Sequence, residues 1–171
     1  MEFQLYATDY DQQALDFVSS KFKVDCFNGD LIEAKYPNNF FDQVNLCHVI
    51  EHVTNPLELL IEIKRILKPG GILSLGTPNS GSFLYKFYRY SMLFRMKVPE
   101  VIDGLEHTYV FSEKLLANFC EDLDFKILMH YSVGLGESIS NLKNSKLSFK
   151  KKLNRFIRNF FKINQWIVCQ K

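Results

Sequence analysis

The stretch FDQVNLCHVIEHV at residues 41–53, followed by LKPGG at residues 67–71, decides the fold of this chain. Residues 43–47 predict a strand. Asn55 and Pro56 predict the start of a helix, because Asn caps helices and Pro suits the first helical position. Pro69, Gly70 and Gly71 are expected to end that helix, and residues 72–75 predict the next strand. A strand, a helix and a strand in this order predict a parallel pair of strands.

The same alternation extends outward from this stretch. Residues 3–8 and 24–27 predict two strands, with a helix between them that Asp11 can cap. After residue 80, a helix is expected from Ser112, which is also a suitable cap, and strands are expected at residues 125–131 and 165–169. Thr77, Pro78 and Asn79 are expected to break the strand at residues 72–75. The pattern predicts an α/β fold with a mostly parallel sheet.

Composition sets the class of protein. A chain of 171 residues that is 47% hydrophobic predicts a single domain spanning residues 1–171. The net charge of +2 gives no reason to expect nucleic acid as a partner. No apolar run reaches the length of a membrane span, and the N-terminus lacks the pattern of a signal peptide, so we expect a soluble, cytoplasmic protein. All four cysteines lie in apolar runs and are expected to be buried free thiols: Cys26, Cys47, Cys120 and Cys169.

The motifs at residues 41–53 and 67–71 resemble the core of class I S-adenosylmethionine (SAM)-dependent methyltransferases, in which an "FD.V" strand, an "hviEHv" turn and an "LKPGG" hairpin recur together. The resemblance implies a Rossmann-like, doubly wound sheet whose last strand, at residues 165–169, is antiparallel and lies between its neighbours. It also implies SAM as cofactor, and methyl transfer to a small-molecule, glycan or lipid-precursor acceptor.

Two acidic residues near the first strands are candidates for the cofactor site. Asp9 follows the first strand, where an open α/β sheet binds ligands, although Asp9 or Asp11 could equally cap the next helix. The resemblance implies that Asp9 binds the ribose and that Tyr10 lies beside the adenine. It further implies that Asp30 binds the adenine amino group and that Leu31 packs on the ring, whereas the residues alone fit a simple Asn-Gly-Asp turn.

The ionisable residues after the third strand allow two interpretations. His48, Glu51 and His52 match the H-x-x-E-H pattern of a zinc site, but that site requires an uninterrupted helix, and Asn55 starts a new helix too soon. The resemblance instead implies that Cys47 and His48 line the methionine end of SAM. Glu51 and His52 then support the loop or meet the acceptor, which makes His52 a candidate catalytic residue. We predict no metal.

The resemblance implies that the segment at residues 80–111 is a lid over the acceptor site. The sequences TPNSGS at residues 77–82 and EHTYVFS at residues 106–112 are similar to those that flank this lid in one branch of the family. His107 is therefore a candidate general base or acceptor-positioning residue. A structural role for His107, in which it fixes the loop by hydrogen bonding, fits the sequence equally well.

Residues 143–162 predict a basic amphipathic helix, with lysines and arginines opposite a face rich in Phe. Such a helix can lie on an anionic membrane or approach a lipid-linked acceptor. Packed against the sheet, the same helix would simply expose its basic face to solvent.

The glycine-rich "hxDhGxGxG" loop that opens this family does not occur here, since the first glycine is Gly29. The resemblance therefore implies an N-terminally truncated domain that lacks the first, central strand. This leaves open a non-catalytic, truncated methyltransferase fold that acts as a binding or accessory protein. It also predicts weak SAM binding, because backbone contacts to the methionyl end are lost.

Overall fold

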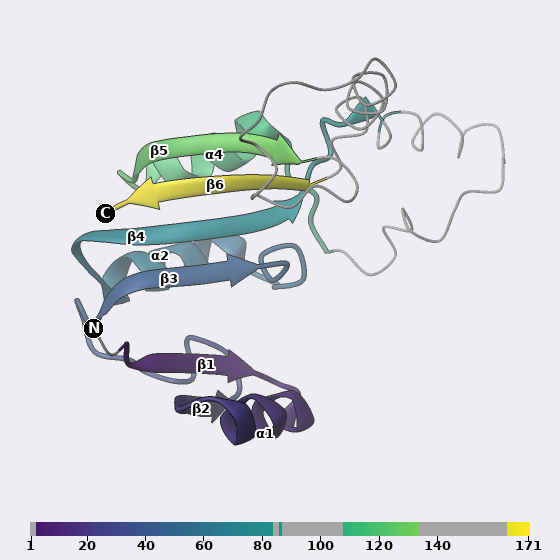
Figure 1. The fold of residues 1–171 in the computed structure, drawn as a ribbon. Coiled ribbons are helices and arrows are strands. Elements are labelled where there is room, and N and C mark those ends of the chain that lie inside the picture. Colours follow the sequence, from purple (N-terminus) through teal and green to yellow (C-terminus); the bar gives the residue numbers. More distant parts are fainter. Residues whose placement is uncertain (1–2, 84–85, 87–107, 134–163) are drawn as a thin grey trace, which may run out of the picture.

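The computed structural model describes residues 3–83, 86, 108–133 and 164–171, and these residues form two sheets (Figure 1). Strands β1 (Leu5–Asp9) and β2 (Val24–Asn28) pair in parallel. The second sheet has the order β3-β4-β6-β5. The predicted lid at residues 80–111 falls mostly outside the described residues, and the predicted basic helix at residues 143–162 lies wholly outside them. Both stay predictions.

Helix α1 (Gln12–Lys21) connects β1 to β2. Asp11 begins it as predicted, because its Oδ1 accepts hydrogen bonds from the backbone N–H groups of Gln13 and Ala14, at 2.9 and 3.3 Å. These bonds satisfy two of the free donors of the first helical turn. Leu15 is the buried residue of the helix.

The larger sheet confirms the predicted topology. Strand β3 (Phe41–Cys47) runs parallel to β4 (Leu67–Pro78), and α2 (Pro56–Ile66) connects them. Helix α4 (Glu113–Asp122) precedes β5 (Lys126–Val133). Strand β6 (Asn164–Gln170) is antiparallel to both β4 and β5 and lies between them. The last strand therefore occupies the expected inserted position.

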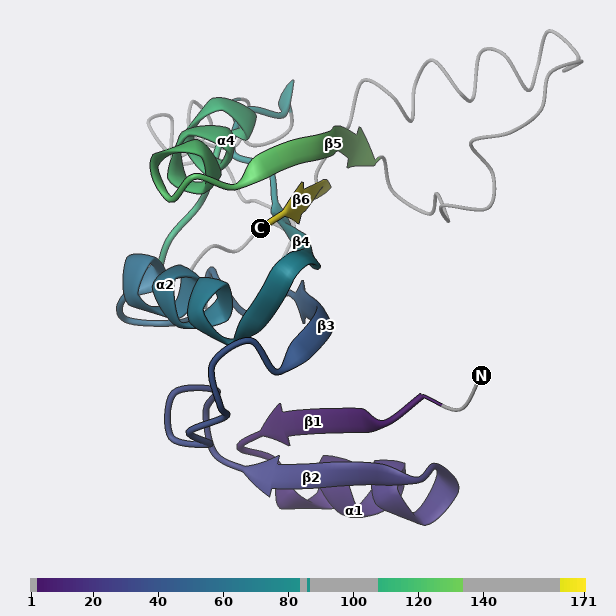
Figure 2. The ribbon, with the colours of Figure 1, turned by 90° about the vertical axis from the view of Figure 1, so that its left-hand side faces the viewer.

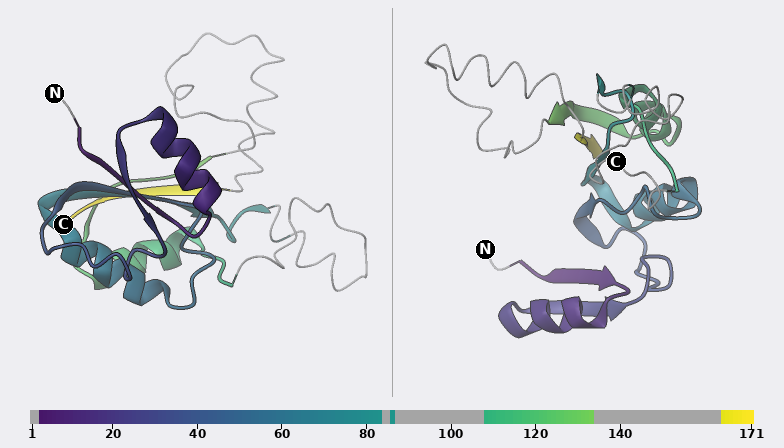
Figure 3. Two further views of the ribbon diagram at one scale, coloured as in Figure 1. Left: turned by 90° about the horizontal axis from the view of Figure 1, so that it is seen from below. Right: turned by 90° about the vertical axis from the view of Figure 1, so that its right-hand side faces the viewer.

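The helices cover both faces of the strands, which makes the fold doubly wound. Helices α2 and α4 lie on the same face of the larger sheet (Figure 2). Helix α1 lies on the opposite side, as the view from below shows (Figure 3). The side chains of α2, α4 and the larger sheet form one buried core: Leu46, Ile50, Leu59, Leu60, Ile63, Leu67, Leu73, Leu75, Phe111, Leu116, Cys120, Phe125, Ile167 and Cys169.

Strand β4 is longer at both ends than the sequence predicted. The LKPGG segment belongs to the strand as a bulge, because Phe41 pairs with Leu67 whereas Gln43 pairs with Ile72. Gly70 supplies a φ of +80° inside the bulge. At the other end the strand continues through Thr77 to Pro78, because both residues pair with β6. The prediction of a break was therefore wrong for Thr77 and Pro78, and the strand ends just before Asn79.

The two sheets meet through side chains. Strands β1 and β3 run in the same direction and lie next to each other (Figure 1). Among the described residues, however, β1 pairs only with β2, and β3 pairs only with β4. An aromatic cluster joins them, in which the Tyr6 ring lies 5.7, 5.3 and 5.3 Å, between ring centroids, from the rings of Tyr36, Phe40 and Phe41.

The prediction of four buried cysteines was half wrong. Cys120 and Cys169 are buried in the core, but Cys26 and Cys47 are exposed. Cys26 lies on β2 and Cys47 on β3, and each of these strands has a single hydrogen-bonded neighbour within the described residues. An apolar run on such a strand is not covered on all sides.

Within the part of the chain that the structure describes, no helix is long and apolar enough to cross a membrane.

Candidate functional site

The carboxyl ends of β1, β2, β3 and β4 define the candidate site. The arrowheads of β1, β3 and β4 point to the same side of the molecule (Figure 1). Asp9 pairs with Asn28 at the end of the smaller sheet, and Cys47 pairs with Gly76 in the larger one. Open α/β sheets bind ligands beyond the carboxyl ends of their strands, so this is the edge where a site is expected.

The sequence allowed either Asp9 or Asp11 to cap α1, and the structure decides between these two caps. Asp11 caps α1, as described above. Asp9 lies at the end of β1, and its Oδ1 accepts a hydrogen bond of 2.9 Å from the backbone N–H of Asp11. The amide of Asn28 donates to the carbonyls of Asp9 and Tyr10, at 3.3 and 3.0 Å, which fixes the two strand ends to each other.

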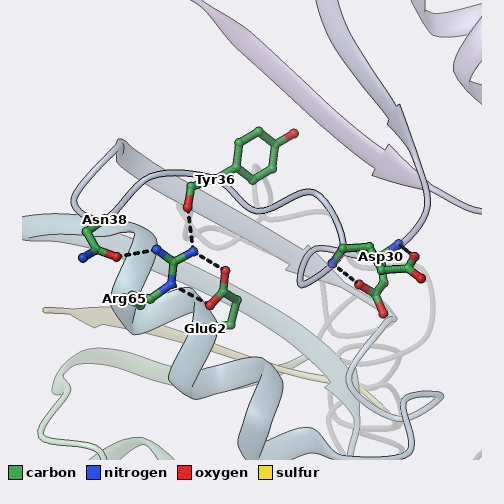
Figure 4. Close-up of polar contacts among 6 residues, drawn as sticks. Asp30, Tyr36, Asn38, Glu62 and Arg65 are labelled. Carbon is green, nitrogen blue, oxygen red and sulfur yellow. Dashed lines mark hydrogen bonds and ion pairs between the residues drawn. The ribbon is translucent and has the colours of Figure 1, made fainter.

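Asp30 lies in a tight turn after β2. Its Oδ1 accepts from the backbone N–H of Glu33 at 2.7 Å, and its own N–H donates to Glu33 Oε2 at 3.1 Å (Figure 4). The Tyr10 hydroxyl donates to Asp30 Oδ2 at 3.3 Å, so the predicted residues Tyr10 and Asp30 meet. Desolvation, and then the negative charge of Asp30, raise the pKa of the Tyr10 hydroxyl. The neighbouring Leu31 packs against the core of the larger sheet.

Gly29 is required at this turn. Its φ of +147° disfavours any other residue, and a Cβ there would lie 2.7 Å from Cε1 of Phe27. Its N–H donates to the Asp9 carbonyl at 3.0 Å. The strand ends of β1 and β2 are therefore held together by backbone as well as side chains.

Arg65 anchors the loop that follows this turn, a role that sequence reasoning missed. Its guanidinium donates to both carboxylate oxygens of Glu62, at 2.6 and 2.7 Å, and to the Tyr36 carbonyl at 2.6 Å (Figure 4). It also donates to Asn38 Oδ1. The hydrogen bonds to Glu62 raise the pKa of Arg65. Arg and Glu three residues apart on a helix were the available signal, but the sequence did not show that a distant loop completes the contact.

His48 is the first residue after β3 and adopts an unusual backbone conformation, with a φ of +52°. Its N–H donates to the Gly76 carbonyl at 2.9 Å, which extends the pairing of β3 with β4. Its Nδ1 lies 3.0 Å from Oε1 of Glu51. The hydroxyl of Thr77 donates to Oε2 of the same carboxylate at 3.0 Å.

The side chains of His48, Glu51 and Thr77 differ sharply in their exposure to solvent. The side chain of Glu51 is fully buried and Thr77 is fully buried, whereas the His48 side chain is 44% exposed. Burial, and then the negative charge of Glu51, raise the pKa of the Cys47 thiol. The sequence assigned Glu51 only a supporting role and missed Thr77, because nothing in the local sequence Thr-Pro-Asn signals a buried hydroxyl aimed at a carboxylate 26 residues earlier.

The two remaining predicted residues are placed less fully. His52 is exposed in the turn after Glu51, and its N–H donates to the Val49 carbonyl at 3.0 Å. His107 lies outside the described residues. Among the residues that the structure describes, no group of three or more His, Cys, Asp or Glu side chains is arranged to hold a metal ion.

Comparison with known proteins relates the first part of the chain to one family. Residues 1–75 match the model of a methyltransferase domain. A probable S-adenosylmethionine-dependent methyltransferase of Mycolicibacterium smegmatis is 34% identical over 76 residues, which cover 44% of this chain and 30% of that protein. A ubiquinone/menaquinone biosynthesis C-methyltransferase (UbiE) of Ruegeria is 32% identical over 107 residues, which cover 60% of this chain and 42% of that protein. The chain thus spans less than half the length of these two curated relatives.

Solved structures share the fold across nearly the whole chain. A SAM-dependent methyltransferase from Archaeoglobus fulgidus superposes with a TM-score of 0.65 at 20% identity, covering 97% of this chain and 75% of that one. One from Mesorhizobium loti superposes with a TM-score of 0.67 at 13% identity, covering 98% and 80%. At these identities the superpositions establish a common fold.

Proposed function

We propose that this chain, whose residues 1–75 match a methyltransferase-domain model, is a class I SAM-dependent methyltransferase domain that binds SAM beyond the carboxyl ends of β1–β4 and takes part in methyl transfer to an acceptor. The observation that carries the proposal is the contact between the ends of β1 and β2. There, Tyr10 and Asp30 are hydrogen bonded, beside Asp9. These are the residues to which the family resemblance assigns the nucleoside.

The side chains at these strand ends suit the nucleoside half of SAM. Carboxylates accept hydrogen bonds from hydroxyl and amino groups, so Asp9 would hold the ribose and Asp30 the adenine amino group. Tyr10 and Leu31 would flank the ring. When bound, SAM supplies an electrophilic methyl group. The anchored loop after Asp30, fixed by Arg65, would keep the adenine side of the site in place before binding.

The described residues at the strand ends offer fewer binding partners to the methionyl half of SAM than to its nucleoside half. It carries a carboxylate, but none of the described residues that directly follow β1, β2, β3 or β4 is a lysine or an arginine. We therefore expect the nucleoside half to dominate the affinity. Adenosine and SAM should bind to this chain with dissociation constants within about tenfold of each other, a difference of at most ~1.4 kcal/mol.

The acceptor is proposed to be a small molecule, a glycan or a lipid precursor. The relatives named for ubiquinone and menaquinone biosynthesis support the small-molecule and lipid-precursor classes. His52 is the proposed catalytic residue at the exposed turn after β3. His107 in the proposed lid, and a membrane or lipid-linked partner of residues 143–162, also belong to this proposal.

Titration calorimetry with SAM, S-adenosylhomocysteine and adenosine tests the proposed cofactor site. In Asp9→Ala we expect all three ligands to bind about 10- to 100-fold more weakly, because a hydrogen bond to a charged group contributes roughly 1.5–3 kcal/mol. Asp16→Ala is the matched control. Asp16 is an exposed carboxylate on α1 that accepts from Gln12 Nε2 at 2.8 Å, and its removal should leave the three affinities unchanged.

Two results would contradict the proposal in different ways. If none of the three ligands binds, the assignment of a SAM site to this chain fails. If SAM binds more than about a hundredfold tighter than adenosine, the methionyl half is recognised strongly, and the emphasis on the nucleoside half is wrong.

A further inference from the structure

The buried carboxylate of Glu51 and the half-exposed imidazole of His48 form a pair for which the family resemblance implies no chemical role beyond His48 lining the methionine end of SAM. Glu51 lies in the turn after β3, and its two carboxylate oxygens are bonded to different partners, His48 Nδ1 and Thr77 Oγ1, both at 3.0 Å. Its backbone is fixed as well, since its carbonyl accepts from the N–H of Tyr109 at 3.0 Å. The carboxylate therefore has little freedom to rotate away from the ring.

The contact with Glu51 decides which ring nitrogen of His48 carries the proton. A carboxylate oxygen accepts hydrogen bonds, so the neutral ring donates from Nδ1–H, and Nε2 holds the lone pair. A buried carboxylate that fixes the tautomer of a partly exposed histidine is the arrangement that orients a general base.

The backbone of His48 adopts a strained conformation in this orientation. A non-glycine residue with a φ of +52° is uncommon, and such conformations persist where the surroundings determine them strongly. Here the hydrogen bond from His48 N–H to the Gly76 carbonyl and the bond from Nδ1 to Glu51 hold both ends of the residue. The ring is thus fixed at the carboxyl end of β3, on the edge where the site is proposed.

We propose that His48 is the residue that accepts a proton from a hydroxyl group of the methyl acceptor, and that Glu51 and Thr77 are its positioning residues. This rests on the proposed function and narrows the acceptor to a hydroxyl compound. Nε2 takes the hydroxyl proton, and the acceptor oxygen keeps the electron pair of the O–H bond. Nδ1–H stays on the ring, which becomes positively charged next to the Glu51 carboxylate.

Nitrogen NMR of the ¹⁵N-labelled full chain tests the tautomer without any cofactor. The ring signals that vanish in His48→Gln identify His48. In the unaltered chain we expect the neutral His48 ring to be the Nδ1–H tautomer. In Glu51→Leu, which removes the acceptor but keeps a side chain of similar size, we expect the Nε2–H tautomer to predominate. Observation of the Nε2–H tautomer in the unaltered chain overturns the proposal.

Acylation by diethyl pyrocarbonate, which attacks the imidazole lone pair, measures the basic character of Nε2. Mass spectrometry should show that His48 is modified several-fold faster in the unaltered chain than in Glu51→Leu. Glu51→Gln keeps an oxygen that can accept from Nδ1 but removes the charge, so it should keep the tautomer and give an intermediate rate. His130 on β5, whose Nε2 lies 3.1 Å from Gln165 Oε1, provides the internal reference, and its rate should be the same in all three proteins.

The outcomes separate this inference from the proposed function. Equal rates for His48 in all three proteins, together with normal adenosine binding, would overturn the role of His48 and leave the cofactor site standing. If Glu51→Leu does not fold, the comparison of Glu51→Gln with the unaltered chain still decides the question, since an unchanged His48 rate would overturn the role of the Glu51 charge.

Discussion

The unit formed by β1, α1 and β2 is buried far less completely than the sheet formed by β3, β4, β6 and β5. Helix α1 buries Leu15, whereas Phe17 on the same helix is 64% exposed and Phe22, which follows it, is 62% exposed. Helix α2 buries Leu60, Ile63 and Ile66 completely. Both units have the same local architecture of strand, helix and parallel strand, so the difference lies in what covers them. The larger sheet carries most of the hydrophobic stabilisation, and the smaller unit depends on its contacts with it.

The largest effect should come from the core of the larger unit. Ile63→Ala removes a fully buried side chain packed in the core formed by α2, α4 and the sheet. We expect a loss of about 3–5 kcal/mol in the free energy of unfolding, because a cavity remains in a closely packed core. Leu15→Ala should lower the free energy of unfolding by less, about 2 kcal/mol, because α1 is thinly covered and can move into the cavity that the side chain leaves. Urea titration measures both, with Phe17→Ala as an exposed control expected to change stability by less than about 0.5 kcal/mol. Equal losses at Ile63 and Leu15 would contradict the comparison.

The second-largest effect should be a difference in local unfolding between the two units. Regions with few buried apolar contacts open with less free energy than the core. In Leu15→Ala, we therefore expect amide hydrogen exchange to accelerate about tenfold or more in β1 and β2, and to stay unchanged in β4 and β6. Hydrogen exchange followed by mass spectrometry gives this pattern. Acceleration spread evenly over both units would show that they unfold together.

The aromatic cluster between the two units should contribute a smaller, measurable coupling. Tyr6 on β1 lies against Phe41 at the start of β3, with ring centroids 5.3 Å apart and planes at 80°. Edge-to-face aromatic pairs contribute about 0.5–1.5 kcal/mol beyond the area they bury. A double-mutant cycle of Tyr6→Leu and Phe41→Leu should give a coupling free energy in that range. The pair Phe17 and Leu59, one residue in each unit, is the control, and its cycle should give no coupling.

The anchor at Arg65 should matter slightly less than the aromatic cluster. Arg65 is 37% exposed at its side chain, and its bonds to Glu62 are partly screened by solvent. Arg65→Lys keeps the charge but loses the planar fork that reaches Glu62, Tyr36 and Asn38 together. We expect a loss below about 1 kcal/mol. We also expect faster proteolysis within residues 30–39, with the fragments identified by mass spectrometry. Unchanged cleavage in this loop would show that Arg65 does not anchor it.

The sequence predicted local features better than contacts between strands, and the reason is physical. Asn55, Ser112 and Asp11 are local signals, since a cap contacts backbone groups two or three residues away, and all three begin helices as predicted. The exposure of Cys26 and Cys47 depends on which strands neighbour β2 and β3, which no local pattern reveals. Likewise, the buried Glu51 and its partner Thr77 are brought together by the pairing of β3 with β4. Family resemblance placed His48 at the strand end, but it did not show what orients the ring.

The smallest expected effect concerns the reactivity of the Cys47 thiol at the end of β3. Burial and the charge of Glu51 raise the pKa of the Cys47 thiol above its ordinary value of about 8.5. The thiolate is therefore disfavoured in the folded chain, so the contribution of Cys47 to stability is complete below that pH and declines as the pH rises above it. In a Cys26→Ser background, which leaves Cys47 as the exposed thiol of the described residues, iodoacetamide should react with Cys47 faster at pH 8 once Glu51→Gln removes the charge. Lys68→Gln is the control, because its partner is Asp42 and its loss should leave the Cys47 rate unchanged. If Glu51→Gln leaves the reaction rate of Cys47 unchanged, the Glu51 carboxylate does not influence the ionisation of the thiol at the end of β3.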